Sequence, residues 1–103
     1  MFTVYVMRSL SNGIHYIGYT SNLEKRLGDH NAGLSRYTSR YRPWEVIYTE
    51  HYVSRSEAMR REKFLKSGAG YTYLKKAGIY KAETNPPEGE AFLLKKLLPN
   101  TML

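Results

Sequence analysis

Two strand-like segments near the N-terminus constrain the fold of this chain more than any other feature. Residues 4–7 and 14–20 are rich in the β-branched and aromatic side chains that are typical of strands. An Asn-Gly pair at 12–13 lies between them, and both of these residues tolerate the positive φ angles of a tight two-residue turn. The sequence therefore predicts an antiparallel hairpin in which Met7 pairs with Gly18.

The predicted hairpin places three notable residues on one face. Because side chains alternate along a strand, Tyr5, Tyr16 and Gly18 are expected on the same side of the sheet. The glycine leaves a gap beside the two phenols, where a ligand can approach the backbone closely. The alternative is purely structural, with two half-buried strand tyrosines and a bulge glycine.

Length and composition limit the class of protein. A chain of 103 residues is expected to form one domain with its own core, and the absence of cysteine excludes disulfides and thiolate metal sites. The N-terminus lacks a signal-peptide pattern, and no apolar run approaches the length of a membrane span. We therefore expect a cytoplasmic protein without a membrane partner, and we favour a monomer.

The positive charge is concentrated in one part of the chain. Residues 1–78 hold 13 Lys or Arg against 6 Asp or Glu, together with nine of the ten tyrosines, whereas residues 79–103 carry no net charge. Cations interleaved with aromatic rings suit a polyanion that has stackable bases, which is a nucleic acid. A basic surface that binds any polyanion weakly is the alternative.

A first helix is predicted to begin at the capping box of residues 21–24, with Leu23 and Leu27 as its apolar contacts. Arg26 and His30 lie one turn apart and flank this apolar stripe. From there both side chains can reach a phosphate bound at the sheet. Alternatively, Arg26 extends to solvent and His30 is an ordinary helix-end residue.

Residues 34–43 have no hydrophobic periodicity and are predicted to form a loop, followed by a third strand over residues 44–53. The loop repeats Ser-Arg-Tyr. Arginine forks onto phosphate, and tyrosine stacks on a base for about 1–3 kcal/mol. A solvated basic loop is the alternative. The nucleic-acid-binding residues predicted here are Arg36, Tyr37, Arg40, Tyr41 and Arg42.

A second helix is predicted to begin at the capping box of residues 54–57. Ala58 and Leu65 form its core stripe, and Glu62 lies on the same stripe. An inward carboxylate is costly unless it is paired. From the sequence, the partner of the Glu62 carboxylate is either a cationic side chain such as Arg26 or a divalent metal ion.

The rest of the chain divides at residue 78. Residues 67–70 (Ser-Gly-Ala-Gly) indicate a helix stop, and residues 71–77 a short third helix. A Pro-containing linker and a two-turn helix are expected farther on. We therefore predict a domain over residues 1–78 and a C-terminal extension over residues 79–103.

The motifs in this order resemble the GIY-YIG endonuclease family, and in particular its small stand-alone bacterial members. The resemblance rests on Tyr5, on Tyr16-Ile17-Gly18 eleven residues later, on residues 23–26 and on Glu62, and it covers about residues 2–78. It implies an α+β domain of the broad α/β class, with a small three-stranded antiparallel sheet flanked by helices. It also implies phosphodiester hydrolysis that depends on a divalent metal, Mg²⁺ or Mn²⁺.

The resemblance also assigns roles to the candidate residues. It implies that Tyr5 and Tyr16 activate and position the attacking water, that Arg26 stabilises the phosphate, and that Glu62 holds the metal. His30 matches a nearby His or Tyr position of the family, so the resemblance includes it among the predicted catalytic residues.

Two functions follow. The first is an endonuclease that acts on DNA, with RNA as the alternative substrate, in DNA repair or processing. The second is a non-catalytic nucleic-acid-binding module that uses the same basic, tyrosine-rich surface. The complete set of Tyr5, Tyr16, Arg26 and Glu62 favours the first, because a pure binder has no need of an inward carboxylate.

Overall fold

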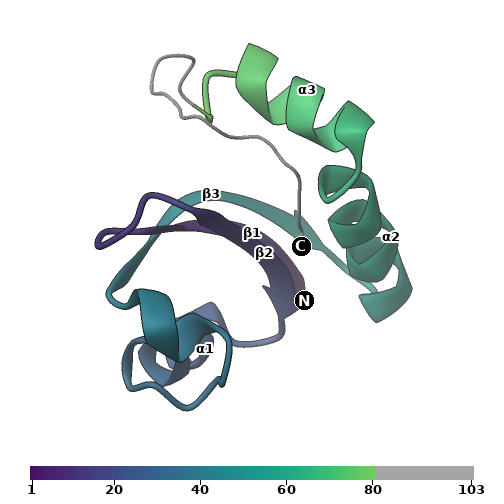
Figure 1. Ribbon diagram of the computed structural model, residues 1–103. Coiled ribbons are helices and arrows are strands. Elements are labelled where there is room, and N and C mark those ends of the chain that lie inside the picture. Colours follow the sequence, from purple (N-terminus) through teal and green to yellow (C-terminus); the bar gives the residue numbers. More distant parts are fainter. Residues whose placement is uncertain (81–103) are drawn as a thin grey trace. The chain divides into compact units, whose positions relative to one another are not determined.

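The computed structural model describes residues 1–80, which belong to two compact units, Met1–Glu62 and the part of the chain from Lys63 onward (Figure 1). The first unit is built on a three-stranded antiparallel sheet, so the predicted α+β class is confirmed. Residues 81–103, with the predicted linker and last helix, lie outside the described residues, and the domain boundary at residue 78 stays a prediction. The elements in chain order are β1 (Phe2–Ser9), β2 (His15–Thr20), α1 (Leu23–Asn31), the 3-10 helix η1 (Thr38–Tyr41), β3 (Trp44–Tyr52), α2 (Arg55–Leu65) and α3 (Gly68–Lys76).

The strands lie in the order β2-β1-β3. Tyr5 pairs with Gly18 and Met7 with Tyr16, so the predicted pairing of Met7 with Gly18 is wrong by two residues. The turn is longer than two residues because Ser9 closes it, its backbone N–H donating at 2.8 Å to the carbonyl five residues farther on. A shift by two residues leaves every side chain on its predicted face. The two tyrosines and the glycine therefore share one face of the sheet, as predicted.

That face of the sheet packs against α1. Tyr5, Met7 and Trp44 are buried, and the predicted helix contacts Leu23 and Leu27 pack against this cluster. Burial of large aromatic and aliphatic side chains is the main term that stabilises such a small sheet. The packing fixes the face of α1 that is turned to the sheet, and so fixes the direction of the residues beside the apolar stripe.

The two predicted capping boxes have different outcomes. Helix α1 is capped by Asn22, whose side chain accepts from the backbone N–H of Lys25 at 3.1 Å, so the predicted cap at Ser21 is wrong by one residue. Serine and asparagine cap about equally well, and only the backbone path decides between them. The second box is confirmed, because Ser54 and Glu57 exchange side chain to backbone hydrogen bonds at 3.2 Å in both directions.

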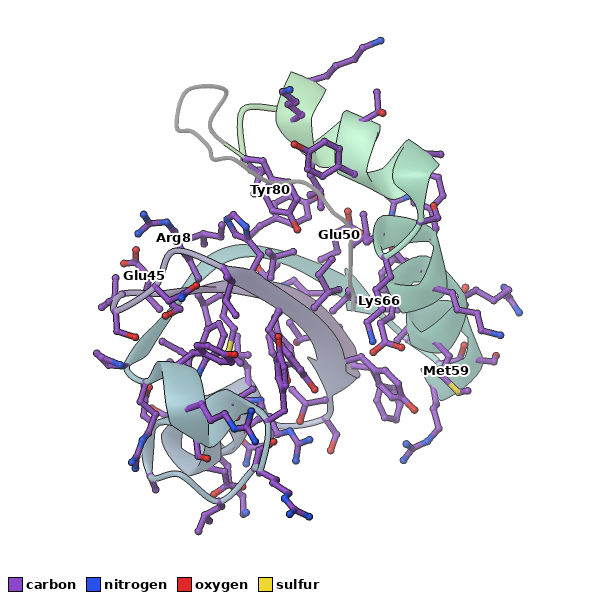
Figure 2. The ribbon with its side chains drawn as sticks, viewed as in Figure 1. Arg8, Glu45, Glu50, Met59, Lys66 and Tyr80 are labelled. Atoms are coloured by element: carbon purple, nitrogen blue, oxygen red, sulfur yellow. The ribbon has the colours of Figure 1, made fainter. Side chains whose placement is uncertain are left out.

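Helix α2 is tied to the sheet by a carboxylate that the sequence did not single out. Glu50 of β3, which is labelled in Figure 2, accepts from the Arg61 guanidinium at 2.8 and 3.1 Å, from the Tyr52 hydroxyl at 2.6 Å and from the Tyr48 hydroxyl. Burial opposes ionisation of Glu50, but these hydrogen bonds outweigh it and lower its pKa. The ion pair holds α2 on β3 immediately next to Glu62, which follows Arg61 in the helix.

The predicted stop after α2 is confirmed, because that helix ends at Leu65, but the predicted start of the next helix at residue 71 is three residues too late. Residues 68–70 form the first turn of α3, which Ser67 caps by accepting from the backbone N–H of Gly70 at 3.2 Å. A Cβ on Gly70 would lie 2.1 Å from the Phe64 carbonyl oxygen and 2.4 Å from Leu65 Cα. The glycine thus allows α3 to approach the end of α2 closely, a requirement that the sequence pattern does not distinguish from a helix stop.

Within residues 1–80, no helix has both the length and the apolar character that crossing a membrane requires.

Candidate active site

A pocket of about 390 Å³ lies where β1 begins and β2 ends. Three charged side chains line it, Arg26 from α1 and Arg55 and Glu62 from α2, together with Tyr5 and Tyr16 of the sheet. Four of the five predicted catalytic and metal-binding residues therefore meet at one cavity. The fifth, His30, does not line the cavity but hydrogen-bonds to Tyr5, which does.

Tyr5 is the buried centre of this arrangement. Its side chain is only 2% exposed, and its hydroxyl lies 3.0 Å from His30 Nε2. Burial raises the pKa of Tyr5 to about 12, although a hydrogen bond from Arg26 acts in the opposite direction. The same hydrogen bond is the main reason that the pKa of Arg26 is raised. Two nitrogen groups thus converge on one phenol oxygen.

His30 is a structural partner of Tyr5 and not the ordinary helix-end residue of the alternative reading. It is 1% exposed, and its Nδ1 lies 2.8 Å from Thr38 Oγ1. Thr38 in turn is held by Trp44, whose indole N–H donates to the Thr38 carbonyl at 2.9 Å. Burial and the nearby positive charge of Arg26 lower the pKa of His30 to about 4, so its imidazole is neutral at pH 7.

The lowered pKa of His30 predicts a specific pH dependence of stability. His30 takes up a proton near pH 6.5 in the unfolded chain but only near pH 4 in the folded chain. The contribution of His30 to the free energy of unfolding is therefore fully present above pH 6.5 and is lost as the pH falls toward 4. The loss from this group is about 3 kcal/mol. Chemical denaturation of wild type and His30→Gln between pH 7 and 4 measures it. We expect a shallower pH dependence in His30→Gln than in the wild type. Equal slopes in the two proteins would refute the assignment.

Gly18 is required by the close approach of the two tyrosines. A Cβ at this position would lie 2.7 Å from the Tyr5 hydroxyl oxygen and 3.2 Å from Tyr16 Cε1. The gap expected at Gly18 therefore receives the hydroxyl end of Tyr5, and the open space that a ligand can enter is the adjoining pocket.

Glu62 supplies the carboxylate of the pocket from the predicted stripe of α2. Ala58 and Leu65 on that stripe are buried, as expected, while Glu62 is half-buried and lines the cavity. No cluster of three or more His, Cys, Asp or Glu able to hold a metal occurs within residues 1–80. A single carboxylate beside an open cavity fits Mg²⁺ or Mn²⁺, because a hard cation of this kind keeps several waters and takes further oxygens from a phosphate substrate.

A series of aromatic rings leads from the pocket toward the loop. The ring centroids of Tyr16 and Tyr37 are 6.3 Å apart, and those of Tyr37 and Tyr41 are 5.5 Å apart. Tyr37 is 49% exposed, whereas Tyr41 packs partly into the core. The predicted loop is therefore more ordered than its sequence indicates, since residues 38–41 form η1. Of the two, Tyr37 presents the larger surface for a base.

The predicted arginines of the loop are exposed and lie outside the pocket lining. Arg42 is held in place, because its Nε donates to the Ser39 carbonyl at 3.0 Å. Arg36 and Arg40 extend from the same loop. The structure thus brings four of the catalytic and metal-binding candidates together at the pocket, whereas these three arginines are exposed residues outside its lining.

Sequence reasoning missed two residues of the site. Thr38 lies in a segment without periodicity, so nothing in the sequence linked it to His30. The sequence pattern places Arg55 only in a capping box, although this residue lies seven positions before Glu62 and therefore on the same side of α2. That spacing was the available signal.

Comparison with known proteins identifies the group to which the chain belongs. The model of the GIY-YIG catalytic domain matches residues 1–73. A UPF0213 protein of Staphylococcus haemolyticus is 45% identical over 65 residues, which are 62% of this chain and 78% of the relative. A UPF0213 protein of Halobacterium salinarum is 43% identical over 67 residues, covering 64% and 86%. The solution NMR structure of a UPF0213 protein from Bacillus halodurans is 30% identical, covers 75% of this chain and 85% of that one, and has a TM-score of 0.45. The chain belongs to the GIY-YIG family of nuclease domains and is similar to its UPF0213 members.

Proposed function

We propose that this protein is a divalent-metal-dependent endonuclease that hydrolyses phosphodiester bonds of DNA. The observation that carries the proposal is the convergence of Tyr5, Tyr16, Arg26 and Glu62 on one solvent-accessible pocket. Family membership supports a nuclease-like function in general, and the excess of positive charge suits a nucleic-acid substrate. A role in DNA repair or processing, a cytoplasmic location and a monomeric state complete the proposal.

Tyr5 is the general base in this proposal. A phenolate at Tyr5 takes a proton from the attacking water, while Tyr16 in the same pocket positions that water. Burial disfavours the phenolate, since the pKa of Tyr5 is about 12. Arg26 counteracts this by donating to the phenol oxygen. Neutral His30 can add a second donor, because Thr38 can supply its hydroxyl proton to Nδ1 while Nε2–H points to Tyr5.

Arg26 and Glu62 hold the reacting phosphate and its metal in this proposal. Arg26 is exposed at the pocket, so part of its guanidinium remains available for a phosphate oxygen. Glu62 would hold Mg²⁺ or Mn²⁺, which supplies Lewis acidity at the phosphoryl oxygens and lowers the pKa of the nucleophilic water. The ion pair between Glu50 and Arg61 keeps the helix in place while Glu62 faces the cavity.

The exposed ring of Tyr37 is expected to stack on a base of single-stranded DNA. Because its exposed ring continues the aromatic series from the pocket, we expect Tyr37→Ala to weaken binding by about 1–3 kcal/mol through the loss of one stacked base. Fluorescence anisotropy with a labelled oligonucleotide in EDTA measures the change. Tyr71→Ala is the matched control, since Tyr71 is 52% exposed but belongs to α3. An equal effect of the two substitutions would count against a stacking position at Tyr37.

The proposed function is tested by incubating the protein with supercoiled DNA, single-stranded DNA and RNA, each with Mg²⁺, with Mn²⁺ and with EDTA. We expect cleavage of DNA that requires metal and stops in EDTA. Binding without cleavage of any substrate, in every metal, would instead establish a nucleic-acid-binding module that uses the same surface. Cleavage of RNA alone would overturn the choice of substrate.

A further inference from the structure

Arg55 is a charged residue of the pocket that the reaction above does not use. It is the first residue of α2, it is exposed, and it lines the same cavity as Glu62. Its guanidinium carbon lies 5.0 Å from the ring centroid of Phe2 and 6.0 Å from that of Tyr19. Among the residues that the structure describes, these rings are its partners and no carboxylate pairs with it.

The two rings place Arg55 on the opposite face of the sheet from Arg26. Phe2 and Tyr19 alternate with the inward Tyr5 and Gly18 along β1 and β2, so their side chains point to the other face. Arg26 instead hydrogen-bonds to Tyr5. The pocket thus extends around the end of the sheet, with a different guanidinium on each side of it.

The spacing along α2 separates Arg55 from the proposed metal ligand. Seven residues correspond to nearly two turns, so Arg55 and Glu62 share one side of the helix at about 10.5 Å along its axis. A group bound at Glu62 and a group bound at Arg55 are therefore neighbours in one cavity, and they are two different groups.

The chemistry of Arg55 matches a phosphodiester. Stacking on aromatic rings restrains the plane of the guanidinium and leaves its N–H edges available for hydrogen bonds. These edges form a fork that fits two oxygens of a phosphate. We propose that Arg55 forms a second phosphate subsite, which binds a backbone phosphate next to the one held by Arg26. The assignment of the first phosphate rests on the proposed function, whereas binding at the second requires no cleavage.

The test is the salt dependence of DNA binding in EDTA, measured by fluorescence anisotropy with a labelled single strand. Each phosphate contact with a single strand contributes about 0.7 to the slope of log affinity against log salt. We expect Arg55→Gln to reduce the slope by about 0.7, Arg26→Gln by about 0.7 and the double variant by about 1.4. Arg55→Lys keeps the charge and is expected to keep the slope. Arg60→Gln is the control, because Arg60 is exposed on the same helix but does not line the pocket.

Two results would overturn the subsite. An unchanged slope in Arg55→Gln, with or without a lower melting temperature, means that Arg55 only packs on Phe2 and Tyr19. A slope in the double variant equal to that of Arg26→Gln means that both arginines bind one phosphate. Because no step of the test involves cleavage, a protein that binds DNA in this way but does not cut it retains the subsite and loses only the proposed activity.

Discussion

Gly18→Ala is expected to reduce DNA cleavage by about 10²-fold, because a shift of about 1 Å in a catalytic group has an effect of that size. The added methyl would lie 2.7 Å from the hydroxyl oxygen of Tyr5 and 2.9 Å from its Cζ. The Tyr5 ring is buried and its hydroxyl is tied to His30, so it has no free space into which to move. The substitution therefore displaces the proposed base, and overpacking lowers stability by about 1–3 kcal/mol.

Gly28→Ala is the matched control for this substitution. A Cβ at Gly28 meets no heavy atom within 4 Å, and the position is inside α1. Alanine there is expected to leave cleavage unchanged and to stabilise the helix by up to about 1 kcal/mol. Single-turnover cleavage rates and thermal melting of the two variants measure these effects on cleavage and on stability. If Gly18→Ala cleaves DNA at the wild-type rate, the position of the Tyr5 hydroxyl does not limit the reaction.

Glu62→Gln is expected to abolish binding of Mn²⁺ at the pocket, since the amide keeps the shape of the carboxylate but removes its charge. Affinity for DNA in EDTA should persist or rise slightly, because a negative charge beside the phosphates is gone. Glu45→Gln is the control, since Glu45 is an exposed carboxylate of β3 (Figure 2). A Mn²⁺ titration followed by calorimetry measures the first expectation.

The same variant separates the metal role from a structural one. If Glu62 mainly stabilises the fold as the partner of a cation, Glu62→Gln lowers the free energy of unfolding, by about 3–5 kcal/mol for a fully buried pair. Glu62 is only half-buried, so we expect a smaller change in melting temperature in EDTA. A large loss of stability with unchanged Mn²⁺ binding would remove Glu62 from the proposed metal site.

The sequence predicted the sheet and its faces because side chains alternate along a strand, so a register error of two residues leaves each side chain on its predicted face. Placing Met7 opposite Gly18 was wrong, yet Tyr5 and Tyr16 were still placed on the correct face, since a register shift by two residues preserves alternation. The cap of α1 and the start of α3 were misplaced for a different reason. Two adjacent residues are equally good caps at 21–22, and Gly70 serves close packing instead of ending a helix.

In the candidate site, the residues on helices could be predicted from periodicity, whereas the contacts between separate elements could not. Helical periodicity placed Arg26 and Glu62 beside the core, and the structure brings both to the pocket. The contact of His30 with Thr38 joins a helix to a segment that has no periodic pattern, so only the folded chain reveals it. The stacking of Arg55 likewise depends on rings from two strands, which no local pattern connects to a helix start.

The most direct test of the central claim is the single-turnover rate of DNA cleavage by wild type and Glu62→Gln, each with Mn²⁺ and with EDTA, at protein concentrations that saturate the DNA. We expect cleavage by wild type only when metal is present, and a rate in Glu62→Gln that is lower by about 10²-fold or more. Equal rates for the two proteins in Mn²⁺, or equal rates for wild type in Mn²⁺ and EDTA, would contradict metal-dependent hydrolysis at this pocket.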